Sequence, residues 1–442
     1  MDVIVKETGT FDREVTITIA ADRVDALLDQ ELGQLAKSAR LPGFRPGKIP
    51  KKLLEAHYRD QLSGVIVEKL VQESYLEVLT KEALHPVDNE PRLTLEKATR
   101  GKPFTYTATI QIFPTVEPTG YTGLALTRRH AEVTEADVDT VVQQLRTERS
   151  RFEVEEGRVA TMGDQLTMDF DGRIDGERFA GGQSTKHLLE LGSGRFIDTF
   201  EEQLVGSVVG EERQVKVAFP TDYRATELAG KEATFDCLIH EVRVRILPPE
   251  DDGLAKLAGL KEGGLAELRA EIRQTLQNQA ERESKQQLKR AIIEQLLAAN
   301  GMEVPSLLVQ SESRVMVAQT KREYERQGMR LADMGVSEEI LTGQFTDSAR
   351  DRVIIGLVLG EIAEREKVVL DEAIVDTQLE EMSASYGERA AAMKEWVRKS
   401  EERMDTLRST VLEQQVIDWI TQNGTVTDES CSFAALTDSS AR

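Results

Sequence analysis

The sequence is long, acidic and only moderately apolar: it has 442 residues, a formal net charge of −22, 40% hydrophobic and 30% charged residues. This length allows two to four domains, each with its own core. The longest apolar run, 353–360, is too short to cross a bilayer, and no secretory signal is visible at the N-terminus. Cys237 and Cys431 form neither a disulfide framework nor a metal pattern, which favours a cytoplasmic protein.

The negative charge is spread unevenly along the chain. When Lys and Arg are counted as +1 and Asp and Glu as −1, the net charge is −2 for residues 1–120, −9 for 121–250 and −11 for 251–442. Residues 37–59 nevertheless carry seven cations and one anion. An acidic body repels nucleic acid at long range, so neither DNA binding nor general nucleic-acid binding is expected. A local basic segment can still dock on one polyanionic or mixed surface.

Residues 1–114 have the pattern of an α+β domain. "DVIVKE" and "EVTITIA" alternate like paired strands, and 21–38 carries a helical apolar stripe. "LPGFRPGKIP" at 41–50 follows, and its prolines and glycines exclude regular structure. A second helix is expected from Pro50, with further helix over 64–84, and "RLTLEKA" and "FTYTATIQIF" are expected as closing strands. The basic segment is therefore predicted to be a loop between two helices.

Residues 115–151 are expected to form a connector. "PTVEPTGYTGL" is rich in Pro and Gly, and "TEADVDTVVQQLRTERSRF" has a helical pattern with Thr134 as its N-cap. From 152 to 246 the pattern becomes β-rich, with alternating apolar residues and many glycine turns. The alternation slips by one residue between Ile239 and Val242, which predicts a β-bulge. This unit is expected to be a small, curved, mostly antiparallel sheet.

Residues 247–424 are expected to be helical. A helix ends at Asn300-Gly301, Pro305 opens the next one, and 347–368 is apolar enough on several sides to be a central helix. Two more helices are predicted at 370–385 and 388–421. The tail from 425 to 442 is polar and is expected to be disordered. The stripe that marks the first of these helices consists of Leu288, Ile292, Ile293, Leu296 and Leu297.

The usual constellations of catalytic residues are missing from the sequence. Five histidines are scattered, none at metal-ligand spacing, so no metal and no cofactor are expected. "LGSGRF" at 191–196 lacks the G-x-S-x-G and G-x-G-x-x-G patterns and lies outside a βαβ context. The paired acids Glu201 and Glu202 are most simply solvated charges. Metal, nucleotide and catalytic-triad chemistry is therefore not expected.

Aromatic residues are dense in the β-rich unit, where seven of the 13 phenylalanines lie between 152 and 235. An ordinary core explains such rings most simply. Several of them fall at turns rather than in mid-strand, however, and a concave aromatic pocket suits a ligand such as a prolyl ring. The rings are Phe152, Phe170, Phe179, Phe196, Phe200, Phe219 and Phe235, with Tyr223 among them.

Three blocks of this unit resemble the FKBP-type peptidyl-prolyl isomerases in order and spacing: "FDGRIDGERFAGG", "LGSGRFIDTFEEQLVG" and "VAFPTDYRATELAGKEATF". "GFRPGKIP" resembles the ribosome-docking signature of the trigger factor family of bacterial ribosome-associated chaperones. The resemblance covers nearly the whole chain. It implies a multidomain α+β architecture with a ribosome-binding α+β domain at 1–114, an FKBP-like antiparallel β domain at 152–246 and an all-α chaperone domain at 247–424.

The FKBP resemblance implies an apolar pocket that grips a proline and holds a twisted amide away from water, without a nucleophile or a metal. Ile197 would offer its backbone N–H to the substrate and Tyr223 its hydroxyl, while Phe219 would belong to the pocket edge or to the core. The residues implied to line the pocket are Phe170, Phe179, Phe196, Ile197, Phe200, Tyr223 and Phe235.

The chain departs from the FKBP pattern at two places. Ala180 stands where the family usually has an acid, and Asp198-Thr199 stand where a proline or arginine followed by glycine is common. Both departures leave the rings in place. Isomerase activity is therefore expected, at reduced efficiency.

Five residues of the basic segment match the docking signature. Phe44, Arg45 and Lys48 occupy its core positions, and Gly43 and Gly47 allow a tight tip. A loop stiffened by proline lowers the entropic cost of docking. The ring would supply a buried anchor, and the cations would pair with ribosomal RNA or acidic side chains. The alternative is a solvated basic loop.

The family resemblance implies an ATP-independent chaperone at the exit tunnel of the large ribosomal subunit. It would bind nascent or unfolded polypeptides and isomerise X–Pro bonds, with no membrane partner, and a homodimer of the free protein is compatible with it. Two alternatives stay open: a soluble FKBP-type isomerase that does not bind ribosomes, and a holdase whose FKBP module is inactive. Methionine side chains adapt to varied apolar partners, so methionines of the helical part could contact clients. An ordinary helix core explains any single one of these methionines equally well. Seven of the ten methionines lie at 302–404: Met302, Met316, Met329, Met334, Met382, Met393 and Met404.

Overall fold

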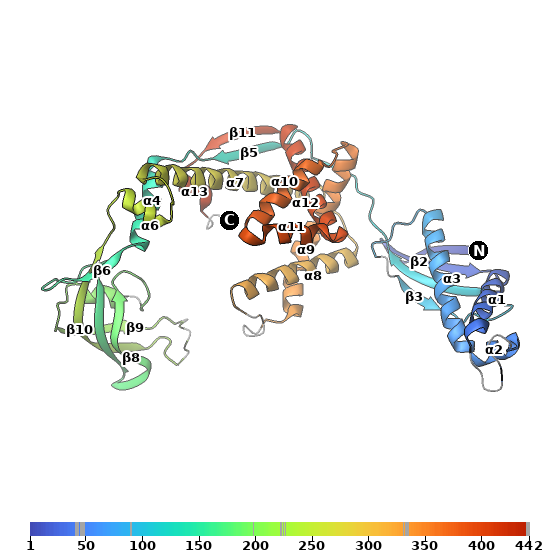
Figure 1. Cartoon of the computed structure of the whole chain (residues 1–442), viewed down its shortest axis with the longest axis horizontal. Coiled ribbons are helices and arrows are strands. Elements are labelled where there is room, and N and C mark those ends of the chain that lie inside the picture. Colours follow the sequence, from blue (N-terminus) through green and yellow to red (C-terminus); the bar gives the residue numbers. More distant parts are fainter. Residues whose placement is uncertain are drawn as a thin grey trace. The chain divides into compact units, whose positions relative to one another are not determined.

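The computed structural model describes residues 1–39, 44, 49–88, 91–197, 199–221, 223, 225, 227–329, 331 and 336–438. The chain divides into two compact units, Met1–Arg128 with Gln287–Thr427 and Arg129–Gln286 with Asp428–Arg442. Along the sequence an α+β part comes first, an antiparallel β part second and a helical part third (Figure 1). The expected fold class is confirmed.

The N-terminal part is a four-stranded antiparallel sheet packed against helices (Figure 1). The strand order is β1-β2-β4-β3, and all three pairings are antiparallel. The strands are β1 (Asp2–Glu7), β2 (Asp12–Ile19), β3 (Arg92–Leu95) and β4 (Phe104–Gln111). The helices are α1 (Ala21–Ser38), α2 (Lys51–His57) and α3 (Arg59–Lys81). The strands and the first helix predicted for this part are confirmed, within a few residues at their ends, whereas the helix predicted to continue from Pro50 to 84 is divided into α2 and α3 at Tyr58.

The core of this part follows from the two periodicities of its sequence. Alternate residues of β2, such as Val15 and Ile17, are fully buried, as every second side chain of a strand points to one face. Buried residues of α1 and α3 complete the same cluster. Within it the Tyr106 hydroxyl lies 2.8 Å from the Ser74 hydroxyl, which satisfies two buried polar groups.

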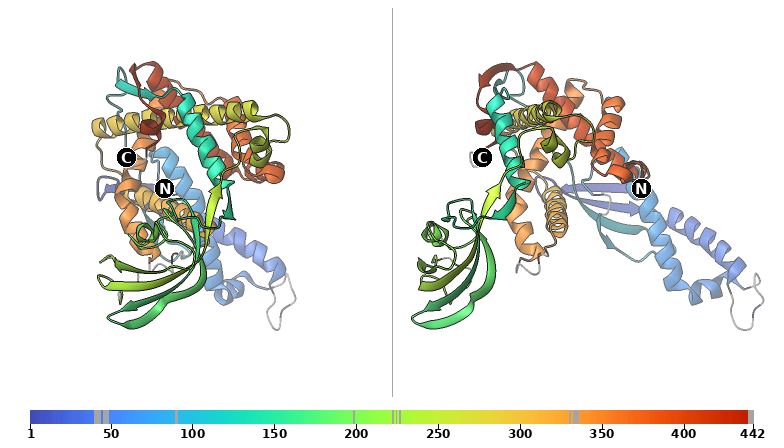
Figure 2. Two further views of the ribbon diagram at one scale, coloured as in Figure 1. Left: turned by 90° about the vertical axis from the view of Figure 1, so that its left-hand side faces the viewer. Right: turned by 60° about the vertical axis from the view of Figure 1, so that its left-hand side comes forward.

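The β-rich part is a five-stranded antiparallel sheet. Its strand order is β6-β10-β7-β8. Strand β9 also pairs with β10, along the edge of β10 opposite β7. The register shifts between Ile239 and Glu241, which confirms the predicted bulge. The strands curve in both views of Figure 2, as bulges favour. The elements are β6 (Arg151–Val154), β7 (Gln165–Ile174), β8 (Glu177–Glu190), β9 (Glu212–Ala218), β10 (Glu232–Ile246) and the short helix α5 (Phe200–Leu204).

The remaining elements are mostly helices. Thr134 is the N-cap of helix α4 (Glu135–Glu148), and its side chain forms a capping box with that of Asp137, so the predicted N-cap is confirmed. Buried residues of α9 form much of the core of the helical part, as the apolar run predicted. The elements are β5 (Ala125–His130), α4 (Glu135–Glu148), α6 (Asp252–Ala258), α7 (Leu265–Ala299), α8 (Ser306–Arg326), α9 (Glu338–Arg365), α10 (Glu372–Ala384), η2 (Gly387–Arg389), α11 (Ala390–Arg398), α12 (Glu401–Gln422), β11 (Thr425–Ser430) and α13 (Phe433–Thr437).

The prediction of a disordered tail from 425 is wrong for 425–437. Strand β11 pairs with β5, and α13 buries Leu436 completely. The tail is polar in composition, but pairing with β5 satisfies its backbone groups, and that stabilisation needs no apolar run.

The prediction of a single helix at 388–421 is also wrong. The segment divides into η2, α11 and α12, and the break falls at Lys399-Ser400. The Ser400 hydroxyl accepts a hydrogen bond from the Arg403 N–H at 3.4 Å and so caps α12. A capping serine that starts a new helix is hard to distinguish in sequence from a serine on a helix surface.

Candidate functional site

The β-rich part contains a cavity of about 520 Å³ walled by rings, called here the aromatic cavity. Strands β7, β8 and β10 and the loops that follow β8 and β9 contribute its walls. The lining residues are Phe170, Phe179, Ala180, Gly181, Arg195, Phe196, Ile197, Phe219, Pro220, Tyr223, Ala225, Leu228 and Phe235. Among these described lining residues, six are aromatic and Arg195 is the one that carries a charge. The cavity therefore suits an apolar group of the size of a side chain or a small ring.

The rings hold one another in edge-to-face contacts. Phe235 meets Phe170, Phe179 and Phe200 with ring centroids 6.0, 5.9 and 5.2 Å apart. Phe196 stacks on Phe200 at 4.6 Å. Such pairs stabilise by about 0.5–1.5 kcal/mol each beyond their burial. The walls of the cavity are therefore preorganised.

A glycine on β7 makes room for the central ring. Gly172 is the cross-strand partner of Phe235. A Cβ on Gly172 would lie 2.5 Å from the Phe235 Cε1 atom, closer than two carbon atoms can approach. Only glycine at this position lets Phe235 lie flat against the sheet and face the cavity.

The structure brings together six of the seven predicted pocket residues: Phe170, Phe179, Phe196, Ile197, Tyr223 and Phe235 all line the aromatic cavity. The seventh, Phe200, is not among the described residues that line it. Phe200 is fully buried beneath Phe196 and supports the wall from behind. Sequence spacing alone does not tell a ring that faces a cavity from one that lies under it.

Near the cavity, one residue was left undecided by the sequence and one was missed. Phe219, left open between pocket edge and core, lines the cavity and is 4% exposed, so it does both. His187 meets Phe170 and Phe196 edge to face, with centroids 5.6 and 5.4 Å away. Its signal in sequence is weak, because a lone histidine on a strand carries no motif.

The β7–β8 hairpin, which carries Phe179 and Ala180, is pinned by a carboxylate. Asp171 accepts hydrogen bonds from Arg178 at 2.7 Å, Gln183 at 2.5 Å and Arg173 at 2.8 Å. The hydrogen bonds from Arg178, Gln183 and Arg173 hold the pKa of the Asp171 carboxyl well below its usual range. The hairpin therefore remains fixed by this carboxylate at neutral pH.

The loop 191–197 encloses the carboxylate of Glu201. Glu201 is 7% exposed, so its interpretation as a solvated charge is wrong. Its oxygens accept hydrogen bonds from the N–H groups of Gly192, Gly194, Arg195 and Phe196 at 2.7–3.2 Å and from the Ser193 hydroxyl at 3.0 Å. Burial raises the pKa of Glu201, but the hydrogen bonds from Phe196, Gly194, Ser193 and Gly192 outweigh it and lower the pKa overall. The carboxylate is therefore charged at neutral pH.

Thr199 stands just before α5 with φ +70°, in the left-handed region. A β-branched residue is strained there, and this is the position where the FKBP pattern commonly has glycine. We expect Thr199→Gly to raise the free energy of unfolding by about 0.5–1 kcal/mol, since the relief of about 1–2 kcal/mol of strain exceeds the extra backbone entropy of glycine. Urea unfolding of the full chain measures it. Thr161→Gly is the control, and equal or lower stability of Thr199→Gly contradicts the prediction.

Of the predicted tip, the structure describes Phe44, whose side chain is 39% exposed between α1 and α2. Gly43, Arg45, Gly47 and Lys48 lie outside the described residues. An exposed phenylalanine beside basic residues in the sequence is compatible with a docking anchor.

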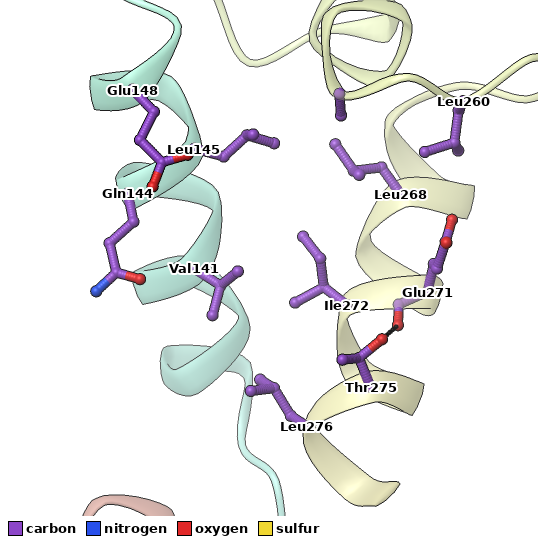
Figure 3. Close-up of a pocket in the computed structure, with 11 residues that line it drawn as sticks. Val141, Gln144, Leu145, Glu148, Leu260, Leu268, Glu271, Ile272, Thr275 and Leu276 are labelled. Atoms are coloured by element: carbon purple, nitrogen blue, oxygen red, sulfur yellow. Dashed lines mark hydrogen bonds between the residues drawn. The ribbon is translucent and has the colours of Figure 1, made fainter. Parts of the chain in front are cut away.

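A second cavity, of about 320 Å³, lies between α4 and the first half of α7 (Figure 3). Val141 and Leu145 of α4 point toward Leu268, Ile272 and Leu276 of α7. The same helices share a buried core. The cavity is therefore a gap in helix packing, rimmed by polar groups such as Glu148 and Glu271.

Two further searches cover the described part of the chain alone. There, no helix combines the length and the apolar character needed to cross a membrane. The same residues contain no group of three or more His, Cys, Asp or Glu placed to hold a metal ion.

The curved antiparallel sheet, the short helix α5 and the aromatic cavity define a class of protein. A family model described as FKBP-type peptidyl-prolyl cis-trans isomerase matches residues 156–244, which contain α5, the aromatic cavity and the sheet except β6 and the last residues of β10. The β-rich part is thus an FKBP-type prolyl isomerase domain within a larger chain.

The flanking parts match one further family. A model for the bacterial trigger factor protein matches residues 1–145, and a model for the C-terminus of that protein matches residues 264–422. The trigger factor of Magnetococcus marinus is 41% identical over 99% of both chains. That of Ectopseudomonas mendocina is 36% identical over 98% of this chain and 97% of its own. A solved structure reported for promiscuous substrate recognition by the trigger factor chaperone covers 96% of this chain and 99% of its own, with 18% identity and a TM-score of 0.49.

The chain belongs to the trigger factor family. As a member it is a ribosome-associated chaperone that acts on nascent polypeptides, with a ribosome-binding N-terminal domain and an FKBP-type peptidyl-prolyl isomerase domain. The expectation from the sequence is confirmed at this level.

Proposed function

We propose that the aromatic cavity receives the prolyl ring of an X–Pro segment and lowers the barrier to rotation about its amide bond. That barrier is about 18–20 kcal/mol because the amide is conjugated. The observation that carries the proposal is a cavity of about 520 Å³ whose wall contains five phenylalanines and one tyrosine. Such a wall binds the ring, excludes water and leaves the amide free to twist.

Two polar groups at the cavity complete this mechanism. The backbone N–H of Ile197 would donate to a carbonyl oxygen of the substrate, and the hydroxyl of Tyr223, 37% exposed, would donate to a second one. A twisted amide has less double-bond character, and its nitrogen is no longer conjugated with the carbonyl. Donors that fit the twisted form better than the planar form favour the transition state, and no covalent step is needed.

An isomerisation assay on an X–Pro peptide tests this proposal. The full chain should accelerate cis/trans exchange above the uncatalysed rate in a concentration-dependent way. A chain that is folded by circular dichroism but gives no acceleration would make the FKBP module inactive, which is the holdase alternative. Ala180 lines the cavity in place of an acid, so the assay also measures how much this departure reduces the rate.

We propose that the tip residues Phe44, Arg45 and Lys48 form the docking point on the large ribosomal subunit near the exit tunnel, with Gly43 and Gly47 allowing its turn. The exposure of Phe44 supports this, as does the concentration of cations at 37–59 in an acidic chain. The cations would face ribosomal RNA or acidic ribosomal side chains. A protein that docks on ribosomes in this way would be cytoplasmic. Whether the free chain forms a homodimer is a separate question, which sedimentation velocity tests.

We propose that exposed apolar side chains of the helical part contact unfolded clients. Of the predicted methionines, Met302, Met393 and Met404 pack against cores, whereas Met329 and Met382 are 39% and 36% exposed. Met334 lies outside the described residues, and the described methionines are a small part of this surface. Its larger contributors include Val315, Ile340, Ile374, Tyr386 and Trp396, each at least 43% exposed.

Replacing two of these residues should weaken client binding. We expect Val315→Ser with Ile340→Ser to require about fivefold more protein for half-suppression of client aggregation, because about 1 kcal/mol of apolar contact is lost. Light scattering of a chemically denatured client on dilution measures it. The control is Val154→Ser with Val159→Ser, an equally exposed pair in the β-rich part. Equal suppression by both double variants would place client binding elsewhere.

A further inference from the structure

The Glu201 carboxylate inside the loop 191–197 has a role that its burial alone does not explain. We propose that Glu201 is a positioning residue for isomerisation: it fixes the backbone of this loop so that the Phe196 ring and the Ile197 N–H face the substrate. The inference rests on the proposed use of the aromatic cavity by a prolyl ring.

The loop has the geometry of an anion-binding nest. Gly192 and Gly194 have φ of +92° and +65°, and this alternation turns successive N–H groups to one side. The N–H groups of Gly192 and Gly194 donate to one carboxylate oxygen, and those of Arg195 and Phe196 donate to the other. The anion that this nest binds is the protein's own side chain.

The two residues held at the end of the loop adjoin the proposed chemistry. Arg195 and Phe196 directly precede Ile197, and all three line the aromatic cavity. Their N–H groups lie 3.0 and 3.2 Å from the Oε1 atom of Glu201. The neighbouring residue Phe200 stacks under the Phe196 ring at 4.6 Å. One turn of α5 thus fixes both the backbone and the ring of this wall.

Only an acceptor without hydrogens fits this site. Four N–H groups and one hydroxyl converge on the two oxygens, three on Oε1 and two on Oε2, and a carboxylate can serve them because both of its oxygens only accept hydrogen bonds. A glutamine has the same shape, but its NH₂ group would face N–H donors on one side. Those donors would lose their partners, and the loop would open.

The experiment compares Glu201→Gln with wild type in the full chain, by isomerase kinetics on an X–Pro peptide. We expect kcat to fall about tenfold with KM changed less than threefold, because the rings bind the planar proline while the Ile197 N–H favours the twisted amide. Hydrogen exchange by mass spectrometry should show faster exchange confined to 191–197. Ser193→Ala, which removes one of the five donors, should lower kcat about two- to threefold.

Two controls separate positioning from stability. Glu202→Gln changes the adjacent, exposed carboxylate and should behave as wild type. Asp164→Asn changes a carboxylate that is 3% exposed in the same domain, and the partners of this carboxylate are Arg158 and Thr161. Asp164 contacts the loop through its backbone carbonyl, which accepts from the Leu191 N–H and is unchanged in the variant. It should lower stability and keep kcat within twofold of wild type.

A folded Glu201→Gln protein with wild-type kcat overturns the inference, as does a loss of kcat in Asp164→Asn equal to that in Glu201→Gln. If Glu201→Gln does not fold, Ser193→Ala decides, and an unchanged kcat in that variant overturns the inference. A wild-type chain without isomerase activity is a different result, visible before any variant is compared, and it overturns the proposed function instead.

Discussion

We expect the affinity of the chain for ribosomes, measured by co-sedimentation, to fall at least about 100-fold when Phe44, Arg45 and Lys48 are all replaced by alanine. A buried aromatic anchor contributes about 2 kcal/mol or more at an interface, and each 1.4 kcal/mol is tenfold. Phe44 is 39% exposed in the free chain, so its ring is available to a partner. The two cations add attraction to a polyanionic surface.

Salt separates the contributions of the ring and the cations. Binding of the wild type should weaken between about 0.05 and 0.2 M salt, because cation–phosphate contacts release counterions. Phe44→Ala alone should weaken binding by a similar factor at both concentrations. Arg45→Ala with Lys48→Ala should reduce the dependence on salt.

A matched triple variant is the control for the tip. Leu76→Ala, Lys81→Ala and Lys97→Ala remove one exposed apolar residue and two exposed cations from the same domain, far from the tip in the sequence. This variant should co-sediment as wild type does. If the tip variant also co-sediments as wild type does, the protein docks elsewhere or acts as a soluble isomerase.

Phe196→Ala should lower kcat/KM for an X–Pro peptide about 30-fold in a protein that remains folded. The ring lines the aromatic cavity and is half-buried, and removing its contact with a bound proline costs about 2 kcal/mol. Stability should fall less than for Phe235→Ala, because Phe235 is 4% exposed and its removal leaves a cavity in the core.

Phe152→Ala is the matched control for this variant. Phe152 is also half-buried in the β-rich part, but its ring packs under the guanidinium of Arg245 at 5.0 Å and does not line the cavity. It should lose stability and keep kcat/KM within about twofold of wild type. Equal losses of kcat/KM in Phe152→Ala and Phe196→Ala would place the active site elsewhere.

Some features of the fold and of the aromatic cavity could be predicted from the sequence because their signals are local. Val15 and Ile17 lie on one face of a strand, and Val24 and Leu28 on one face of a helix, since the two periodicities are properties of a short segment. The bulge near Ile239 is visible as a change of phase. The resemblance supplied six residues of the aromatic cavity, since motif spacing is preserved when a fold is shared.

Other features needed the folded chain. Glu201 looks like any surface glutamate in sequence, and it is buried because the backbone turns at Thr199 and brings α5 beneath the loop 191–197. Phe200 looks like its neighbour Phe196, yet one ring supports the wall and the other forms it. The strand at 425–430 exists because β5 pairs with it.

The sequence by itself determined the order of the domains, most of their strands and helices, the concentration of cations around Phe44 and the identity of the rings. Only the tertiary structure decided which ring faces the cavity, which carboxylate is enclosed and which part of the tail is ordered. The physical reason is that periodicity and turn residues act within a few positions of the chain. Burial and hydrogen-bond partners depend on segments that the fold brings together.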